Sequence, residues 1–103
     1  MTVSTAFQMF ATDAPAHHAA WMTAVGSLAA ASSLDERSDE LAYVAVLAAT
    51  GMHSGLPFHV QRLRALGATR DEVISAVLVG LPAVGHQVVA ALPVALAAYD
   101  DAS

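Results

Sequence analysis

The amino-acid sequence predicts an all-α protein of about five to six helices that associates with copies of itself. Three observations support this prediction. Helix start and stop signals recur along the 103 residues, and no stretch shows the alternation of a β-strand. Alanine-rich apolar runs lie between those signals. Hydrophobic residues make up 56% of the chain and charged residues only 13%, which exceeds what the interior of one small domain can bury.

The first half of the chain contains a weakly patterned segment and two predicted helices. Residues 1–13 are expected to form an arm or a short helix. A helix is predicted over residues 14–31, with Asp13 as its N-cap and Trp21 packed in a core or an interface. Ser33 to Glu36 has the spacing of a capping box, which begins a helix that ends at Gly51. The nine apolar residues from Leu41 to Ala49 indicate that nearly every side of this helix is covered.

The second half of the chain contains three more predicted helices. One begins between Ser54 and Pro57 and ends at Leu66, with Gly67 in the left-handed conformation after it. Thr69 to Glu72 is a second capping box, whose helix ends near Pro82. The last helix is predicted over residues 84–99, with a kink at a proline. At this length, residues 1–103 are expected to form a single domain.

The composition excludes several classes of function. The net charge is −5 and all four basic residues are arginines, so we expect no nucleic-acid partner. The chain has no cysteine, which excludes disulfides and thiolate catalysis and suits a cytoplasmic protein. Residues 73–99 carry no charge and are long enough to span a bilayer. They also contain glycines, prolines and the polar pair His86-Gln87, so we predict no membrane association.

Two side chains, Glu40 and His59, are the candidate catalytic residues. Glu40 precedes the long apolar run and shares a helix face with Tyr43 and Leu47, so its carboxylate is expected to be partly shielded from water. The alternative is a surface glutamate whose stem covers the edge of the core. His59 lies in the first turns of the following helix, where the helix dipole favours a neutral ring that accepts a proton. The alternative there is a packed core histidine.

The order and spacing of motifs between residues 34 and 91 resemble the carboxymuconolactone decarboxylase family, which includes the AhpD-like alkylhydroperoxidases. The resemblance rests on Glu40-Leu41, on His59, and on the run from Arg64 to Val73. The positions that match the family pattern in place are His59, Gly67, Thr69 and Glu72, and Gly85 lies where a late glycine is expected. The substitutions are Asp39 for arginine, Leu63 for alanine and Val73 for isoleucine.

The family that this chain resembles has two branches, and the chain is similar to only one of them. The peroxidase branch has a C-x-x-C-x-x-x-H signature, and here Met52 and Gly55 occupy the two cysteine positions. The chain is therefore similar to the branch without these cysteines, and we predict no thiol peroxidase activity. The decarboxylases also have a tyrosine and a G-x-P motif, where this chain has Ala83 and residues 85–87, so the substrate stays open. The resemblance further implies homotrimers or hexamers.

The predicted function is cofactor-free acid/base chemistry on a small acidic or carbonyl-bearing metabolite, with decarboxylation as the leading case. An isomerase or cyclase in a biosynthetic pathway, using the same Glu/His pair, is one alternative, and a non-catalytic oligomeric scaffold is the other. The candidate substrate-binding residues are His53, His86 and Tyr43. No metal is predicted, because the spacing of His53, His59 and His86 matches no metal motif.

Overall fold

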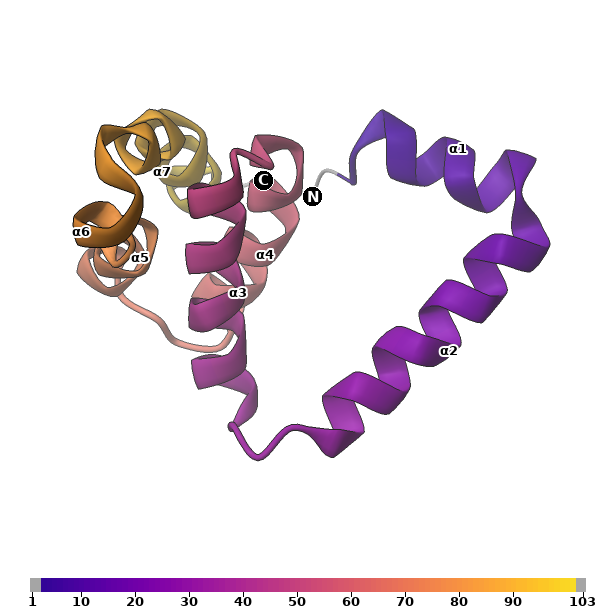
Figure 1. Cartoon of the computed structure of the whole chain (residues 1–103). Coiled ribbons are helices and arrows are strands. Elements are labelled where there is room, and N and C mark those ends of the chain that lie inside the picture. Colours follow the sequence, from indigo (N-terminus) through magenta and orange to yellow (C-terminus); the bar gives the residue numbers. More distant parts are fainter. Residues whose placement is uncertain (1–2, 102–103) are drawn as a thin grey trace.

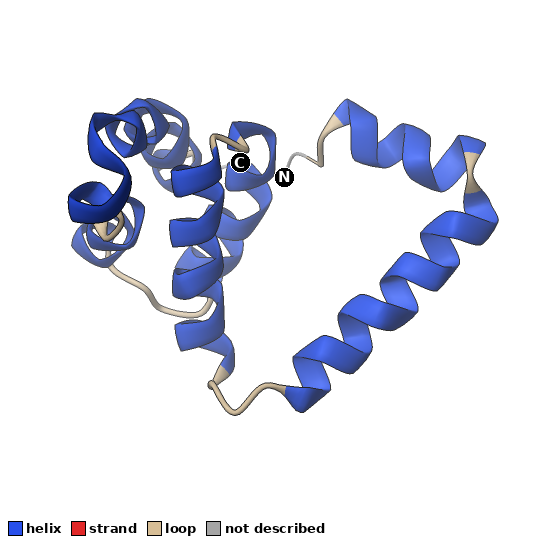
Figure 2. Ribbon diagram, in the orientation of Figure 1, coloured by secondary structure: helices blue, strands red, loops and turns tan. Residues whose placement is uncertain are grey.

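The computed structural model describes residues 3–101, and every regular element in that range is helical, which confirms the predicted all-α fold (Figures 1 and 2). The elements are α1 (Thr5–Asp13), α2 (Pro15–Ala31), α3 (Glu36–Thr50), the 3-10 helix η1 (His53–Gly55), α4 (Leu56–Ala65), α5 (Arg70–Leu78), α6 (Leu81–Val84), the 3-10 helix η2 (Gly85–Ala91) and α7 (Leu92–Asp100).

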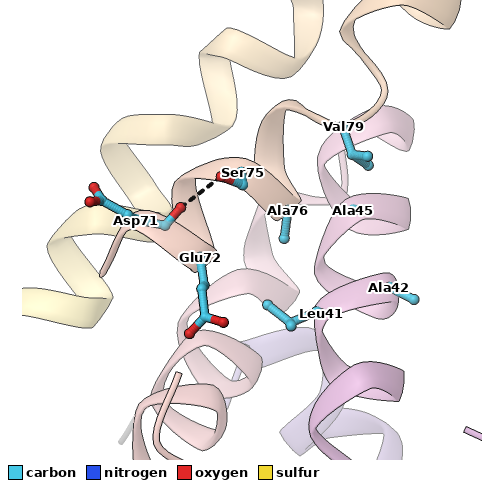
Figure 3. Close-up of a pocket in the computed structure, with 8 residues that line it drawn as sticks. All are labelled: Leu41, Ala42, Ala45, Asp71, Glu72, Ser75, Ala76 and Val79. Atoms are coloured by element: carbon cyan, nitrogen blue, oxygen red, sulfur yellow. Dashed lines mark hydrogen bonds between the residues drawn. The ribbon is translucent and has the colours of Figure 1, made fainter. Parts of the chain in front are cut away.

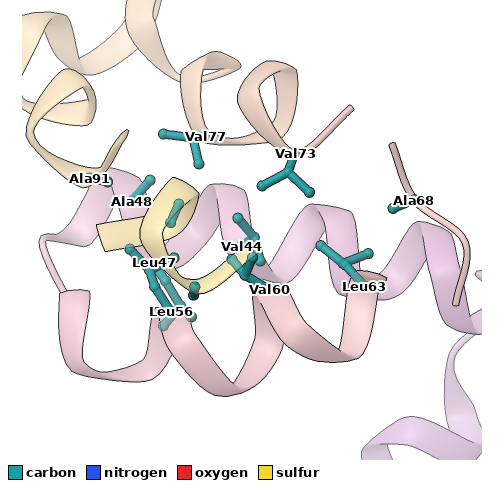
Figure 4. Close-up of a cluster of buried hydrophobic side chains, with 12 residues drawn as sticks. Val44, Leu47, Ala48, Leu56, Val60, Leu63, Ala68, Val73, Val77 and Ala91 are labelled. Atoms are coloured by element: carbon teal, nitrogen blue, oxygen red, sulfur yellow. The ribbon is translucent and has the colours of Figure 1, made fainter. Parts of the chain in front are cut away.

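The core lies between α3, α4, α5, η2 and α7, which pack around one cluster of apolar side chains (Figure 4). Val44 on α3, Val60 and Leu63 on α4, and Val73 on α5 are fully buried. The buried members of the cluster are Val44, Leu47, Ala48, Leu56, Val60, Leu63, Ala68, Val73, Val77, Ala91, Ala95 and Ala98. Burial of a valine or leucine side chain is worth about 1.5–3 kcal/mol, so this cluster fixes the position of α3 against α4.

Helices α1 and α2 form an arm that extends away from the rest of the chain (Figure 1). They contact each other, and neither contains a buried residue. Trp21 on α2 is 54% exposed, so within one chain it is not part of a core. The predicted N-cap of α2 is also wrong, because Ala14 occupies that position without a side-chain bond and Asp13 is the last residue of α1.

The start of α3 differs from the predicted capping box. The N-cap is Asp35, whose carboxylate accepts a hydrogen bond from the backbone N–H of Ser38, rather than Ser33. This contact lowers the pKa of the Asp35 carboxyl. The second predicted capping box is confirmed, since Thr69 and Glu72 exchange side-chain and backbone hydrogen bonds at the start of α5. Gly67 adopts the left-handed conformation predicted for it, with φ of +87°, and Gly51, where α3 ends as predicted, adopts it as well, with φ of +73°.

The C-terminal third is divided into short pieces rather than one kinked helix. Pro82 and Pro93 lie in the first turns of α6 and α7, where the missing proline N–H costs no hydrogen bond. The break falls at Gly85, with φ of +81°. By length and composition alone, the stretch Arg70–Asp100 would suffice to cross a membrane. Val73, Val77 and Ala95 of this stretch belong to the buried cluster, and 17% of its most apolar 18-residue window is buried.

The long apolar run of α3 led us to expect a helix that is covered on nearly every side. Within one chain, the structure does not show this. Val44, Leu47 and Ala48 face the core, but Tyr43 and Val46 on the outward face are 46% and 55% exposed. The surplus of apolar residues predicted from composition is therefore visible on the surface of α3 and on the arm.

Candidate active site

Glu40 and His59 meet where α3 and α4 pack against each other as a helical hairpin. Gly51 ends α3, η1 reverses the chain, and α4 returns along α3, which places the second turn of α3 beside the first turn of α4. The Oε2 atom of Glu40 lies 2.8 Å from Nδ1 of His59. The pair is therefore a direct hydrogen bond between residues 19 positions apart in the sequence.

The pair is shielded from water but still reachable. The side chain of Glu40 is 13% exposed and that of His59 is 23% exposed. The ring of Tyr43 lies against His59 with the two centroids 4.5 Å apart, and Phe58 meets the same ring edge-on at 5.0 Å. A small reactant can thus reach the imidazole from outside, while two aromatic rings limit the number of waters around it.

Arg62 is a further member of the site that the sequence did not indicate as Glu40's neighbour. Its Nε atom lies 3.8 Å from Oε1 of Glu40, and its guanidinium also donates a hydrogen bond to Glu36. The arrangement follows from helix geometry, because Glu36 precedes Glu40 by one turn of α3 and Arg62 follows His59 by one turn of α4. The carboxylate of Glu40 therefore has two partners, an imidazole and a guanidinium. The sequence also gave no indication that the ring of Phe58 would contact His59.

The hydrogen bond to Glu40 gives the two nitrogens of the His59 imidazole different roles. If Nδ1 donates a proton to the carboxylate, Nε2 is the nitrogen left to exchange a proton with a bound molecule. The carboxylate also orients the ring and stabilises it when it carries a positive charge. The geometry thus suits general acid/base chemistry at Nε2 of His59.

The other candidate binding residues lie outside this contact network. His53 is half-buried in η1 and His86 is exposed in η2, and among residues 3–101 no hydrogen bond, ion pair or ring contact of either imidazole side chain is found. In the same range no group of three or more His, Asp or Glu side chains is arranged to hold a metal ion. Tyr43 is the one candidate binding residue in this set that contacts the pair.

An open groove of about 590 Å³ lies between α3 and α5 (Figure 3). It is lined by Leu41, Ala42, Ala45, Asp71, Glu72, Ser75, Ala76 and Val79. Neither Glu40 nor His59 lines it. The groove therefore does not enclose the Glu40–His59 pair.

Glu72 at the edge of the groove is a structural residue. Its carboxylate forms an ion pair with Arg37 and accepts a hydrogen bond from the backbone N–H of Thr69. The hydrogen bond from Arg37 is the main cause that lowers the pKa of Glu72 to about 2. The carboxylate is therefore ionised at neutral pH and serves as a cap, as predicted from the sequence.

Comparison with known proteins agrees with the resemblance noted in the sequence. The model of the carboxymuconolactone decarboxylase family matches residues 15–97. No curated protein and no solved structure matches the chain significantly. The family match covers α2 through most of α7 and includes Glu40 and His59. This chain, without the cysteines of the peroxidase branch, therefore belongs to the carboxymuconolactone decarboxylase family.

Proposed function

We propose that this protein is an acid/base enzyme that acts without a cofactor on a small acidic or carbonyl-bearing metabolite, with decarboxylation as its reaction. The observation that carries the proposal is the 2.8 Å contact between Glu40 and His59. Family membership supports chemistry of this kind, and the absence of cysteine from the whole sequence argues against a thiol peroxidase.

The reaction assigns one role to each group. The substrate loses carbon dioxide when its carbon–carbon bond breaks, and the electron pair moves toward a neighbouring carbonyl to give an enolate. The imidazolium of His59 donates its Nε2 proton to the carbon and becomes neutral. Its Nδ1–H group continues to donate a hydrogen bond to Glu40. Glu40 stabilises the imidazolium before the transfer, and Arg62 partly balances the negative charge of Glu40 once the ring is neutral. The ring then regains its Nε2 proton from water, which completes the cycle.

The same pair would serve an isomerase or a cyclase in a biosynthetic pathway, because those reactions also remove and return a proton beside a carbonyl. A non-catalytic oligomeric scaffold is the remaining alternative. It is favoured by one observation, namely that the groove between α3 and α5 does not contain the pair. We propose Tyr43, whose ring contacts His59, as a substrate-binding residue, and His53 and His86 as secondary contacts.

We further infer that the protein works in the cytoplasm as a homotrimer or hexamer, with no nucleic-acid or membrane partner. The exposed apolar side chains of α2 and α3 support self-association, since soluble proteins rarely leave such surfaces uncovered. The net charge of −5 and the absence of lysine support the exclusion of nucleic acid.

The test of the function is a decarboxylation assay on a panel of small lactone acids and β-keto acids, including 4-carboxymuconolactone. We expect release of carbon dioxide and, in D₂O, one deuterium at the carbon that lost the carboxyl group. His59→Ala should abolish both signals while the helical circular dichroism and the molar mass stay unchanged. An active His59→Ala variant would exclude the role proposed for this residue, and a wild-type protein inactive on the whole panel would favour the scaffold.

A further inference from the structure

Helices α3 and α4 each carry a row of polar and aromatic side chains where they lie side by side (Figure 1). On α3 the row is Glu36, Glu40 and Tyr43, which are spaced four and three positions apart and therefore share a face. On α4 it is His59 and Arg62, three positions apart. The rows meet, because Glu40 bonds to His59 and Glu36 bonds to Arg62. These five side chains form a strip that we call the α3–α4 seam.

The α3–α4 seam is aromatic at one end and charged at the other. Tyr43 follows Glu40 by about one helical turn and Glu36 precedes it by about one turn, so they lie in opposite directions along the axis of α3. The ring of Tyr43 contacts the ring of His59, with the centroids 4.5 Å apart. A molecule bound at His59 therefore has an aromatic ring beside one end and the guanidinium of Arg62 beside the other.

The guanidinium of Arg62 is only partly occupied by its two glutamate neighbours. Its Nε atom lies 3.8 Å from Oε1 of Glu40, and its Nη2 group donates a hydrogen bond to Glu36. Among residues 3–101 no hydrogen bond of the Nη1 group is found, and the side chain is 44% exposed. A carboxylate that approaches from solvent can therefore bind Nη1 and Nη2 together, which is the bidentate geometry that arginine favours.

The two glutamates of the α3–α4 seam differ in how easily they release Arg62. Glu40 is 13% exposed and bonded to His59, so it stays in position. Glu36 is 59% exposed, and an ion pair between exposed side chains contributes little to stability. Glu36 also lies in the first turn of α3, where the helix dipole stabilises its charge without Arg62. It can therefore turn toward water with little loss of stability.

The charge of the α3–α4 seam makes this movement necessary for an anionic ligand. Two carboxylates and one guanidinium leave one net negative charge while the imidazole is neutral. A further carboxylate is repelled as long as Glu36 remains on Arg62, because like charges at this separation are unfavourable. Once Glu36 turns away, the guanidinium faces the incoming carboxylate with only Glu40 beside it.

We propose that Arg62 is a substrate-binding residue whose guanidinium is occupied by Glu36 in the free protein and exchanges Glu36 for a carboxylate of the substrate. The inference rests on the proposed function, since the bound molecule is the acidic substrate of that reaction. Glu36 then acts as an internal competitor for the site, and the strength of its contact with Arg62 sets the affinity for the substrate.

The carboxylate that Arg62 binds is one that does not react. Side chains three positions apart on a helix have Cβ atoms about 5–6 Å apart, so a carboxylate on Arg62 lies roughly that far from the carbon at Nε2 of His59. A guanidinium on the departing carboxylate would hinder the reaction, because it would stabilise the charged substrate more than the transition state. The α3–α4 seam thus selects substrates that keep one carboxylate through the reaction.

The test measures binding separately from turnover, by following the imidazole NMR resonances of His59 while glutarate is added. Glutarate has two carboxylates joined by a short flexible chain, so one can reach Arg62 while the other lies near His59. We expect saturable shifts of the His59 resonances, which the spectrum of His59→Gln identifies. Dimethyl glutarate has the same chain without charge and should leave them unchanged.

Two substitutions should change the affinity for glutarate in opposite directions. Arg62→Gln should weaken binding at least about tenfold, because charge-assisted hydrogen bonds are lost. Glu36→Gln should strengthen it several-fold, because the competing carboxylate is removed. Arg62→Lys should fall between Arg62→Gln and the wild type, since the ammonium keeps the charge without the planar fork. Arg70→Gln is the matched control, because Arg70 is 49% exposed and paired with Asp100 on α7, and it should bind like the wild type.

Three results would overturn the proposal. An affinity that is unchanged in Arg62→Gln would exclude this residue from binding. Weaker binding in Glu36→Gln would mean that Glu36 positions the guanidinium rather than occupying it. A wild-type protein whose His59 resonances do not move with glutarate would have no carboxylate site at the α3–α4 seam.

These readouts also separate this inference from the proposed function. A protein that binds glutarate through Arg62 but releases no carbon dioxide from any substrate would contradict the reaction and leave the role of Arg62 standing. A protein that catalyses decarboxylation with the same KM in Arg62→Gln as in the wild type would contradict the role of Arg62 and leave the reaction standing.

Discussion

Glu40→Gln isolates the charge of the carboxylate from its shape. The amide is the same size, and its oxygen can still accept a hydrogen bond from Nδ1 of His59, 2.8 Å from the present carboxylate oxygen. What is lost is the negative charge that faces both His59 and Arg62. A hydrogen bond to a charged group contributes about 1.5–3 kcal/mol and a neutral one about 0.5–1.5, so the expected loss of stability is about 1 kcal/mol.

That loss is small compared with the expected effect on catalysis. About 1 kcal/mol lowers the melting temperature of a domain of this size by roughly 4–8 °C, and a stable protein stays folded at 25 °C. Removal of an acid/base group or its activating partner lowers the rate by about 10²–10⁴-fold. The variant should therefore be folded but nearly inactive, and this combination identifies a role in the reaction rather than in the fold.

The assay combines thermal unfolding by circular dichroism, at one fixed protein concentration, with the rate of carbon dioxide release. Asp100→Asn is the matched control, because it also removes one carboxylate charge from an ion pair, here with Arg70 at the surface. It should leave the rate unchanged. The reasoning would be refuted by a Glu40→Gln protein that loses stability as calculated and keeps the wild-type rate, since the pair would then be only structural.

Three other changes test the fold and its electrostatics. Leu63→Ala removes a fully buried side chain and should lower the free energy of unfolding by about 2–5 kcal/mol in urea titrations, against less than about 0.5 for exposed Leu34→Ala. Gly67→Ala places a residue with a Cβ atom at φ of +87°, and the backbone strain should lower the free energy of unfolding by about 1–2 kcal/mol in the same titrations. The new Cβ would meet no neighbouring atom, so strain is the only cost. As the control, Gly26→Ala within α2 should be stabilising. The pKa of Glu72 is lowered from 4.5 to about 2, so its ionised form stabilises the folded state above pH 4.5, and this contribution disappears as the pH falls toward 2. Glu72→Gln should accordingly melt below the wild type at pH 7 and approach it in acid, and a gap that widens in acid would reverse that sign.

The features that the sequence predicted correctly depend on short-range chemistry. Thr69 and Glu72 are three positions apart and satisfy each other's backbone groups, so their capping box forms wherever a helix begins there. Gly51 and Gly67 end helices because only glycine adopts positive φ without strain. Glu40 and His59 were chosen as candidates from their places at the edge of an apolar run and in the first turns of the next helix, and the structure joins them by a direct hydrogen bond.

The features that the sequence did not predict depend on a choice between near-equal local signals or on tertiary packing. Ser33 and Asp35 can both cap α3, and the structure selects Asp35. A proline can end one helix or begin the next, and Pro82 and Pro93 begin α6 and α7. The groove depends on the angle between α3 and α5, which no local pattern in either helix specifies.

The positions of Met52 and Gly55 allow the branch assignment to be tested by adding the missing chemistry. Both flank or lie in η1, where the N–H of Gly55 donates a hydrogen bond to the carbonyl of Met52 at 3.3 Å. Gly55 has an ordinary negative φ, so a side chain is tolerated by the backbone. Its Cβ would meet a terminal methyl carbon of Leu47 at 3.3 Å, a contact that a small shift of that side chain relieves. The double change Met52→Cys and Gly55→Cys therefore fits the present fold.

If the Glu40–His59 pair transfers protons for more than one kind of reaction, the side chains beside it determine which reaction the protein catalyses. The double variant should consume hydroperoxide, with the two thiols oxidised to a disulfide as the peroxide becomes an alcohol and water, and a dithiol donor should restore the thiols. The wild type should show no such consumption. Adding His59→Ala to the double variant should remove the activity, since the thiol then has no base. Peroxide consumption that survives His59→Ala would mean that the cysteines react alone and that the pair transfers no proton.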